Sequence, residues 1–94
     1  MTKKLYDIDS HLFEFEATVI DSYPSLDGFA TVLDQTAFFP EGGGQSSDIG
    51  FIDEVKVYDV QINDEVIYHY TTKQFEKGQK VTGKIDFIRR FDYM

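Results

Sequence analysis

Hydrophobic and polar residues alternate strictly in two parts of the chain, at positions 13–19 and 81–87. A period of two turns one apolar face toward a core and leaves the other face to solvent, which is typical of a β-strand. Residues 29–33 are β-branched and aromatic and predict a further strand. The turn-forming residues at 21–28 predict the connection that precedes it.

The apolar pattern between residues 51 and 62 is too long and too mixed for one flat strand, so we expect a bend or bulge near Asp53 and Glu54. Asn63 and Asp64 predict a hairpin turn into a strand at 66–70. Residues 71–78 predict a longer turn, with Phe75 filling the core. Residues 1–9 are polar and without periodicity, and predict a frayed or edge-pairing start.

Five or six short strands at close spacing predict an all-β fold, a small antiparallel β-barrel. Closure into a barrel would leave no exposed sheet edge. Residues 89–94 lose the alternation and predict the start of a helix that the chain does not complete. We expect one domain, residues 1–94, which is the N-terminal part of a longer protein.

A glycine-rich segment interrupts the strand pattern, with Pro40 and Glu41 followed by three glycines at 42–44 and by Gln45. Consecutive glycines carry a large entropy cost on ordering, but their missing Cβ atoms let the backbone approach another group closely. Gln45 adds two donors and one acceptor beside that backbone. Composition leaves two interpretations open, a tight corner between strands and a loop that faces a ligand.

Charge is distributed unevenly. The 94-residue chain has a net charge of −8, from 17 acidic and 9 basic residues. Residues 1–72 hold three bases against 14 acids, whereas residues 73–94 hold six bases against three acids. The acidic body repels phosphate groups, so only the C-terminal part could face a polyanion. The sequence contains no Cys, which excludes disulfides and thiolate metal sites within the chain. No apolar run approaches the roughly 20 residues that span a bilayer, and we expect a cytoplasmic protein without membrane contact.

Candidate metal ligands are few. His11 and His69 lie on different predicted strands with no further ligand at a metal-binding spacing, so we interpret them as ordinary strand residues. Asp34, Glu41 and Asp48 surround the glycine-rich segment and could gather on a cation. The alternative is that they are solvated or bond to nearby backbone groups. We expect no metal site in this chain.

Residues 34–45 read Asp-Gln-Thr-Ala-Phe-Phe-Pro-Glu-Gly-Gly-Gly-Gln and are followed by Asp48 and Gly50. This ordered set resembles the glycine-rich signature of alanyl-tRNA synthetase editing regions and of their freestanding relatives, the AlaX-type trans-editing proteins. The resemblance continues at intervals from residue 57 to residue 94. The chain departs from it at Phe39, where the family often has Tyr.

The resemblance implies an N-terminal β-barrel from a protein that hydrolyses tRNA(Ala) mischarged with serine or glycine. It implies that the substrate-binding part of this barrel consists of Thr36, Gly42, Gly43, Gly44 and Gln45. In the family a second, C-terminal lobe supplies the zinc ligands, and none of them matches a residue here. The resemblance therefore implies no catalytic residue in this chain, with Zn and the hydrolytic step belonging to a missing lobe.

Within the family we expect a freestanding trans-editing protein, the alternative being an editing-region fragment of alanyl-tRNA synthetase itself. Two alternatives outside catalysis remain: a translation-factor-type barrel that binds RNA or protein, and a structural or oligomerising β-domain. The oligomeric state and the preferred mischarged amino acid stay open.

Overall fold

The computed structural model describes residues 3–5, 13–25, 27–42 and 47–86. Within these residues no helix is long and apolar enough to cross a membrane. The strands are β1 (Lys3–Lys4), β2 (Glu14–Pro24), β3 (Phe29–Leu33), β4 (Gln35–Thr36), β5 (Gly50–Ile52), β6 (Val55–Asn63), β7 (Val66–Thr71) and β8 (Lys80–Ile85).

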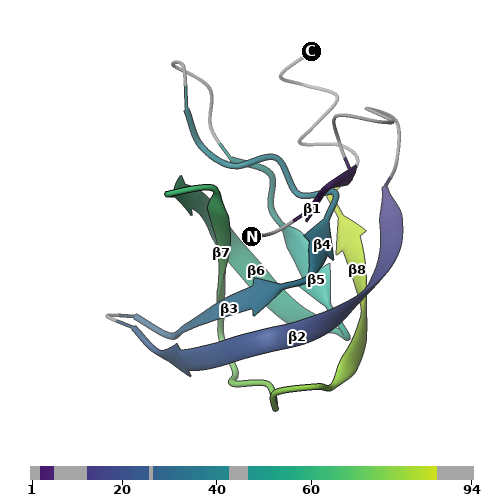
Figure 1. Cartoon of the computed structure of the whole chain (residues 1–94), viewed down its shortest axis with the longest axis vertical. Coiled ribbons are helices and arrows are strands. Elements are labelled where there is room, and N and C mark those ends of the chain that lie inside the picture. Colours follow the sequence, from purple (N-terminus) through teal and green to yellow (C-terminus); the bar gives the residue numbers. More distant parts are fainter. Residues whose placement is uncertain (1–2, 6–12, 26, 43–46, 87–94) are drawn as a thin grey trace.

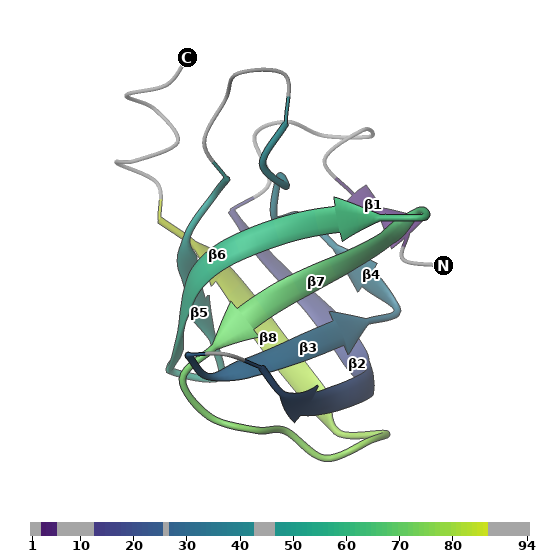
Figure 2. The same cartoon turned by 90° about the vertical axis from the view of Figure 1, so that its left-hand side faces the viewer.

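Six of the strands close into a barrel in the order β2-β3-β7-β6-β5-β8 (Figures 1 and 2). All neighbouring pairs in the barrel are antiparallel. Pairing of β8 with β2, which places Gly83 opposite Phe15, closes the sheet on itself. The short strands β1 and β4 form a separate parallel pair. The prediction of a small antiparallel β-barrel of five to six strands is confirmed.

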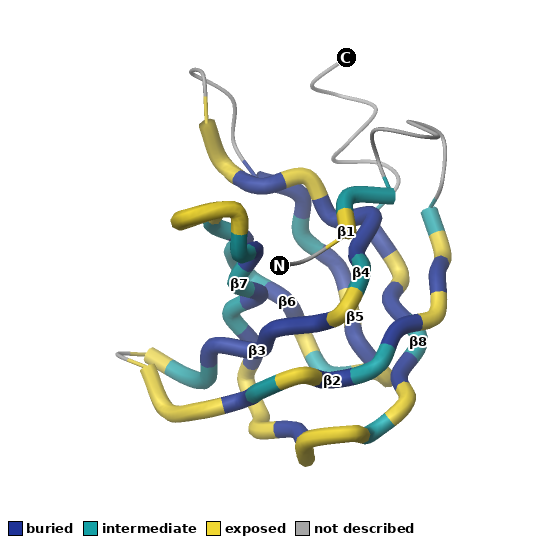
Figure 3. Tube along the Cα trace, in the orientation of Figure 1, coloured by how far each residue is buried: buried dark blue, intermediate teal, exposed yellow. Residues whose placement is uncertain are grey.

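Alternate residues of the strands fill the interior, which appears as dark segments along each strand in Figure 3. Phe38, which follows β4, is fully buried in this core. Its ring makes edge contacts with Phe15, at 5.7 Å between centroids, and with His69, at 5.4 Å. Edge-to-face packing of this kind adds to the stabilisation that burial of the aromatic surface already provides.

Several predictions about individual elements are confirmed. Strand β3 occupies the residues predicted for it, and β8 turns Val81 and Ile85 inward as the alternation indicated. Phe75 is buried in the core beneath the turn between β7 and β8. Lys3 and Lys4 pair with β4, as an edge-pairing start predicts. The helix start predicted at 89–94 lies outside the described residues.

The first connection is shorter than predicted. Strand β2 continues to Pro24, and the turn is closed by the Ser25 N–H, which donates to the Gly28 carbonyl oxygen at 2.8 Å. The first half of β2 pairs with β8 and its second half pairs with β3, with a shift of register between Val19 and Asp21. Such a bulge bends a strand, so one strand can turn a barrel corner and serve two neighbours.

The run from 51 to 62 is interrupted at Asp53 and Glu54, where a bend or bulge was predicted, but the interruption is a turn between two strands. Asp53 and Glu54 form a tight turn between β5 and β6, with φ angles of 47° and 68°. Asp64 and Glu65 form the turn between β6 and β7, with φ angles of 51° and 65°, one residue beyond the predicted pair. Turns with two positive φ angles usually carry Asn and Gly, and these acidic pairs lack that signal.

Replacing Glu54 by glycine is expected to stabilise the barrel. Glu54 is exposed and holds a left-handed conformation that costs a residue with a Cβ more than it costs glycine. Glycine also has more conformational entropy in the unfolded chain, which offsets part of this effect. We therefore expect the free energy of unfolding to rise by about 0.5 kcal/mol. Urea unfolding measures it, with Glu54→Ala as the control that keeps the Cβ. Equal stability of the two variants would contradict the assignment of backbone strain.

Candidate functional site

The glycine-rich segment connects β4 to β5 at one end of the barrel (Figure 1). Its two stems are tied together at the base. The Phe39 N–H donates to Asp48 Oδ2 at 2.8 Å, and the Asp48 N–H donates to the Phe39 carbonyl oxygen at 2.9 Å. Asp48 is buried, so this pair of bonds is shielded from competing water. The loop therefore starts and ends on a closed base.

Strand β6 anchors both stems to the barrel wall. On the first stem, the Glu41 N–H donates to the Val60 carbonyl oxygen at 2.9 Å. On the second stem, Ser47 Oγ donates to Asp59 Oδ1 at 3.0 Å and accepts from the Val60 N–H at 3.2 Å. Gln61 adds a hydrogen bond from its amide to Glu41 Oε1 at 3.0 Å. Three consecutive residues of one strand thus hold the loop from both sides.

Inside the barrel, Thr36 and His69 form a buried hydrogen-bonded pair, with 2.8 Å between Thr36 Oγ1 and His69 Nε2. His69 Nδ1 lies 3.0 Å from the carbonyl oxygen of Thr31. A carbonyl oxygen only accepts, so the proton of neutral His69 resides on Nδ1. His69 Nε2 is then an acceptor, and the Thr36 hydroxyl must be its donor.

Burial determines the charge of His69. The side chain is fully buried, and this desolvation lowers its pKa from 6.5 to about 4, although the hydrogen bond to the Thr31 backbone acts in the opposite direction. The ring is therefore neutral at pH 7. The Thr36 hydroxyl also accepts from the Phe38 N–H at 3.0 Å, so the pair links strand β7 to the first residues of the glycine-rich stem.

Two of the residues predicted to bind substrate, Thr36 and Gly42, lie in the described part of the chain, and they differ in burial. Thr36 is fully buried, with its hydroxyl proton committed to His69. Gly42 is exposed, and a Cβ added there would meet no atom within 4 Å. Gly43, Gly44 and Gln45 lie outside the described residues. Direct contact of these residues with a substrate stays a prediction, and the burial of Thr36 favours a role in positioning the stem.

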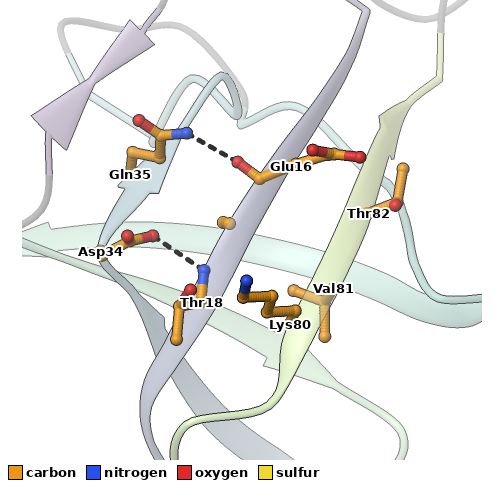
Figure 4. A pocket seen from close by; sticks show the side chains of 8 residues that line it. Glu16, Thr18, Asp34, Gln35, Lys80, Val81 and Thr82 are labelled. Atoms are coloured by element: carbon orange, nitrogen blue, oxygen red, sulfur yellow. Dashed lines mark hydrogen bonds between the residues drawn. The ribbon is translucent and has the colours of Figure 1, made fainter.

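A pocket of about 310 Å³ lies over the outer face of β2, between β8 and the link from β3 to β4 (Figure 4). Within it the Thr18 N–H donates to Asp34 Oδ1 at 2.9 Å, and Gln35 Nε2 donates to the Glu16 carbonyl oxygen at 2.7 Å. These bonds fasten the residues just before Thr36 to β2. The polar groups of Asp34 and Gln35 are therefore used to hold the chain on its way into the glycine-rich segment.

The carboxylates considered as a cation site take separate partners. Asp34 bonds to Thr18, Asp48 bonds to Phe39, and Glu41 bonds to Gln61. In the described part of the chain, no three His, Asp or Glu side chains gather as possible metal ligands. Asp34 and Asp48 accept hydrogen bonds from backbone N–H groups, as the alternative interpretation predicted, whereas Glu41 accepts from a side-chain amide.

His69, Ser47 and Asp59 are functional candidates that the sequence did not single out. For His69 a signal existed, because Ile67, His69 and Thr71 alternate with outward tyrosines and share the inward face of β7. A polar residue on a buried face needs a partner. Ser47 and Asp59 are 12 positions apart, and no sequence pattern pairs them.

Comparison with known proteins finds relatives over almost the whole chain. Residues 10–89 match the family model described as tRNA synthetases class II (A). The chain is 46% identical over 98 residues to the alanine–tRNA ligase of Halobacterium salinarum, covering 95% of the chain and 10% of that protein. It is 41% identical over 93 residues to the enzyme of Haloquadratum walsbyi, again with 95% and 10% coverage. The enzyme of Ignicoccus hospitalis is 39% identical over 97 residues, with 99% and 10% coverage. The chain spans about a tenth of the length of these relatives.

Proposed function

The chain belongs to the family of tRNA synthetases class II (A), and from this premise we propose that it is the non-catalytic half of an editing unit that hydrolyses tRNA(Ala) mischarged with serine or glycine. One observation carries the proposal. Both stems of the glycine-rich loop are fastened to the barrel, at Phe39 with Asp48 and at β6, while Gly42 stays exposed with open space beside its Cα. A rigid scaffold that presents a bare backbone suits close approach to a ligand.

Within this proposal the loop residues contact the aminoacyl end of the tRNA. Backbone N–H groups from Gly42 to Gly44 approach the terminal adenosine or the amino acid, because no Cβ stands in the way. The Gln45 amide distinguishes a serine hydroxyl from an alanine methyl. When alanine is bound, the amide has no hydroxyl to bond to, and its unpaired polar group disfavours binding. Thr36, held between His69 and Phe38, positions the stem.

Zinc does not fit the described residues of this chain, because they offer no group of three ligands. We therefore assign the metal and the hydrolytic step to a second lobe, and the barrel's part is to bind and orient the substrate. Such a division requires the loop to face that lobe. It also requires mischarged tRNA(Ala) to reach the barrel through the whole protein, since the acidic body of this domain repels phosphate.

Deacylation of seryl-tRNA(Ala) is expected to fall about tenfold in Gln45→Ala, the equivalent of one lost hydrogen bond to a substrate. The assay uses a polypeptide that contains residues 1–94 together with the zinc lobe. Gln74→Ala is the matched control, because this amide bonds to the Ser22 carbonyl oxygen at 2.8 Å, away from the loop. We expect the control to deacylate normally and residues 1–94 alone to show no turnover. Zinc-independent turnover by residues 1–94 would refute the proposal.

A further inference from the structure

Four tyrosines gather on the outer face of the sheet. They are Tyr23 on β2, Tyr58 on β6, and Tyr68 and Tyr70 on β7, and we call this surface the tyrosine face. The strands that carry it lie side by side on the near side of Figure 2, with β3 between β2 and β7.

The strand register explains why these side chains meet. Ala30 on β3 lies opposite Tyr23 on one side and Tyr70 on the other. Its neighbour Thr31 points into the barrel and is fully buried, so Ala30 points outward, yet only 2% of it is exposed. Its cross-strand neighbours must cover it. A small residue at this position lets the two tyrosines approach each other over β3.

Specific contacts order the face. The rings of Tyr58 and Tyr70 lie 6.5 Å apart between centroids. The Tyr58 hydroxyl rests above Gly28, where an added Cβ would lie 2.6 Å from it. Tyr68 lies close enough to Tyr23 to raise the pKa of its hydroxyl. Tyr23 nevertheless remains 41% exposed, so part of this aromatic surface is open to a partner.

Carboxylates border the face. Burial raises the pKa of Tyr23, and the nearby tyrosines and Asp21 raise it further. Burial also raises the pKa of Tyr58, followed by the effect of Asp27 and Asp59. These three acids therefore lie within electrostatic range of the phenols. None of them forms an ion pair with another residue in the described ranges.

We propose that the tyrosine face, bordered by Asp21 and Asp27, docks an arginine-rich segment of a partner protein. Charge complementarity selects this occupant, because the exposed carboxylate of Asp27 and the half-buried carboxylate of Asp21 attract a guanidinium and repel the phosphates of a nucleic acid. The aromatic rings select it as well, since guanidinium groups stack on tyrosine. Tyrosine and arginine are both enriched where protein interfaces concentrate their binding energy.

The test measures binding of a fluorescent peptide of alternating arginine and serine to the 94-residue chain by fluorescence anisotropy. We expect saturable binding that weakens about fivefold in Tyr23→Ala and in Asp21→Asn, because each removes one stacking or one charge contact. Tyr23→Phe keeps the ring and is expected to retain most of the binding. Glu54→Gln is the charge-matched control, and it removes one negative charge at the turn between β5 and β6.

Equal weakening by Glu54→Gln and Asp21→Asn would overturn the proposal, because the peptide would then sense net charge alone. Binding of a short single-stranded oligonucleotide that Tyr23→Ala abolishes would assign the face to nucleic acid instead. Sedimentation velocity provides the third outcome. Self-association that Tyr23→Ala abolishes would show that a second copy of the chain covers the face, which also overturns the proposal.

Discussion

Replacing Gly50 by alanine is expected to lower the free energy of unfolding by about 3 kcal/mol or more, the range of severe core overpacking. Gly50 on β5 lies between Val57 of β6 and Ile85 of β8. An added Cβ would lie against the carbonyl oxygen of Lys84 and 2.9 Å from the Ile85 Cα, and both of these atoms belong to the backbone. Relief of this overlap requires β5 and β8 to separate, which opens the barrel.

Gly42→Ala is the matched control for this prediction. At Gly42 a Cβ would meet no atom within 4 Å, so we expect a change in stability of less than about 0.5 kcal/mol. Urea unfolding followed by circular dichroism measures both variants. If Gly50→Ala were as stable as Gly42→Ala, the close pairing of β5 with β8 would be wrong.

Acidification from pH 7 to pH 4 is expected to remove about 3 kcal/mol of stability through His69 alone, since one pKa unit corresponds to about 1.4 kcal/mol. The pKa of His69 is lowered from 6.5 to about 4 in the fold by burial. Between these two values the unfolded chain binds a proton that the folded chain rejects. The contribution of His69 to the free energy of unfolding is therefore fully present above pH 6.5 and declines as the pH falls toward 4.

His69→Gln separates this effect from the titration of the many carboxylates. Glutamine does not titrate. In the variant, the carboxylates still contribute to the pH dependence of the unfolding free energy, but the imidazole no longer does. We expect the difference in unfolding free energy between the native protein and the variant to shrink as the pH falls from 6.5 to 4. A difference that stays constant over this range would mean that His69 is not buried as a neutral ring. The same result would remove the basis for assigning the Thr36 hydroxyl as its donor.

Alternation along the chain was sufficient to predict most of the barrel. Strands β3 and β8 lie where the pattern placed them, and the inward residues of β2 are those that the period of two selected. The turns were placed less accurately. Asp53 with Glu54 and Asp64 with Glu65 adopt positive φ angles without glycine. The residue types do not indicate this conformation, because it is imposed by the two-residue connection between twisted antiparallel strands.

The candidate site was predictable only as a segment. The ordered motif at residues 34–45 indicated the family, and the family model and the alanine–tRNA ligase relatives confirm that relationship. The motif did not indicate how its parts are held. Thr36 was expected at a substrate surface, yet it is fully buried against His69. Ser47, which the sequence did not single out, bridges the loop to Asp59 and Val60.

The sequence by itself determined the class of fold and the family, because hydrophobic period and an ordered motif are properties of neighbouring residues. Only the tertiary structure decided which distant side chains meet. Thr36 bonds to His69 across 33 positions, and Tyr23 and Tyr70 flank the same residue of β3, Ala30. These pairs depend on the strand order and register in which the barrel closes, and that order is selected by packing of the whole core rather than by any local stretch of chain.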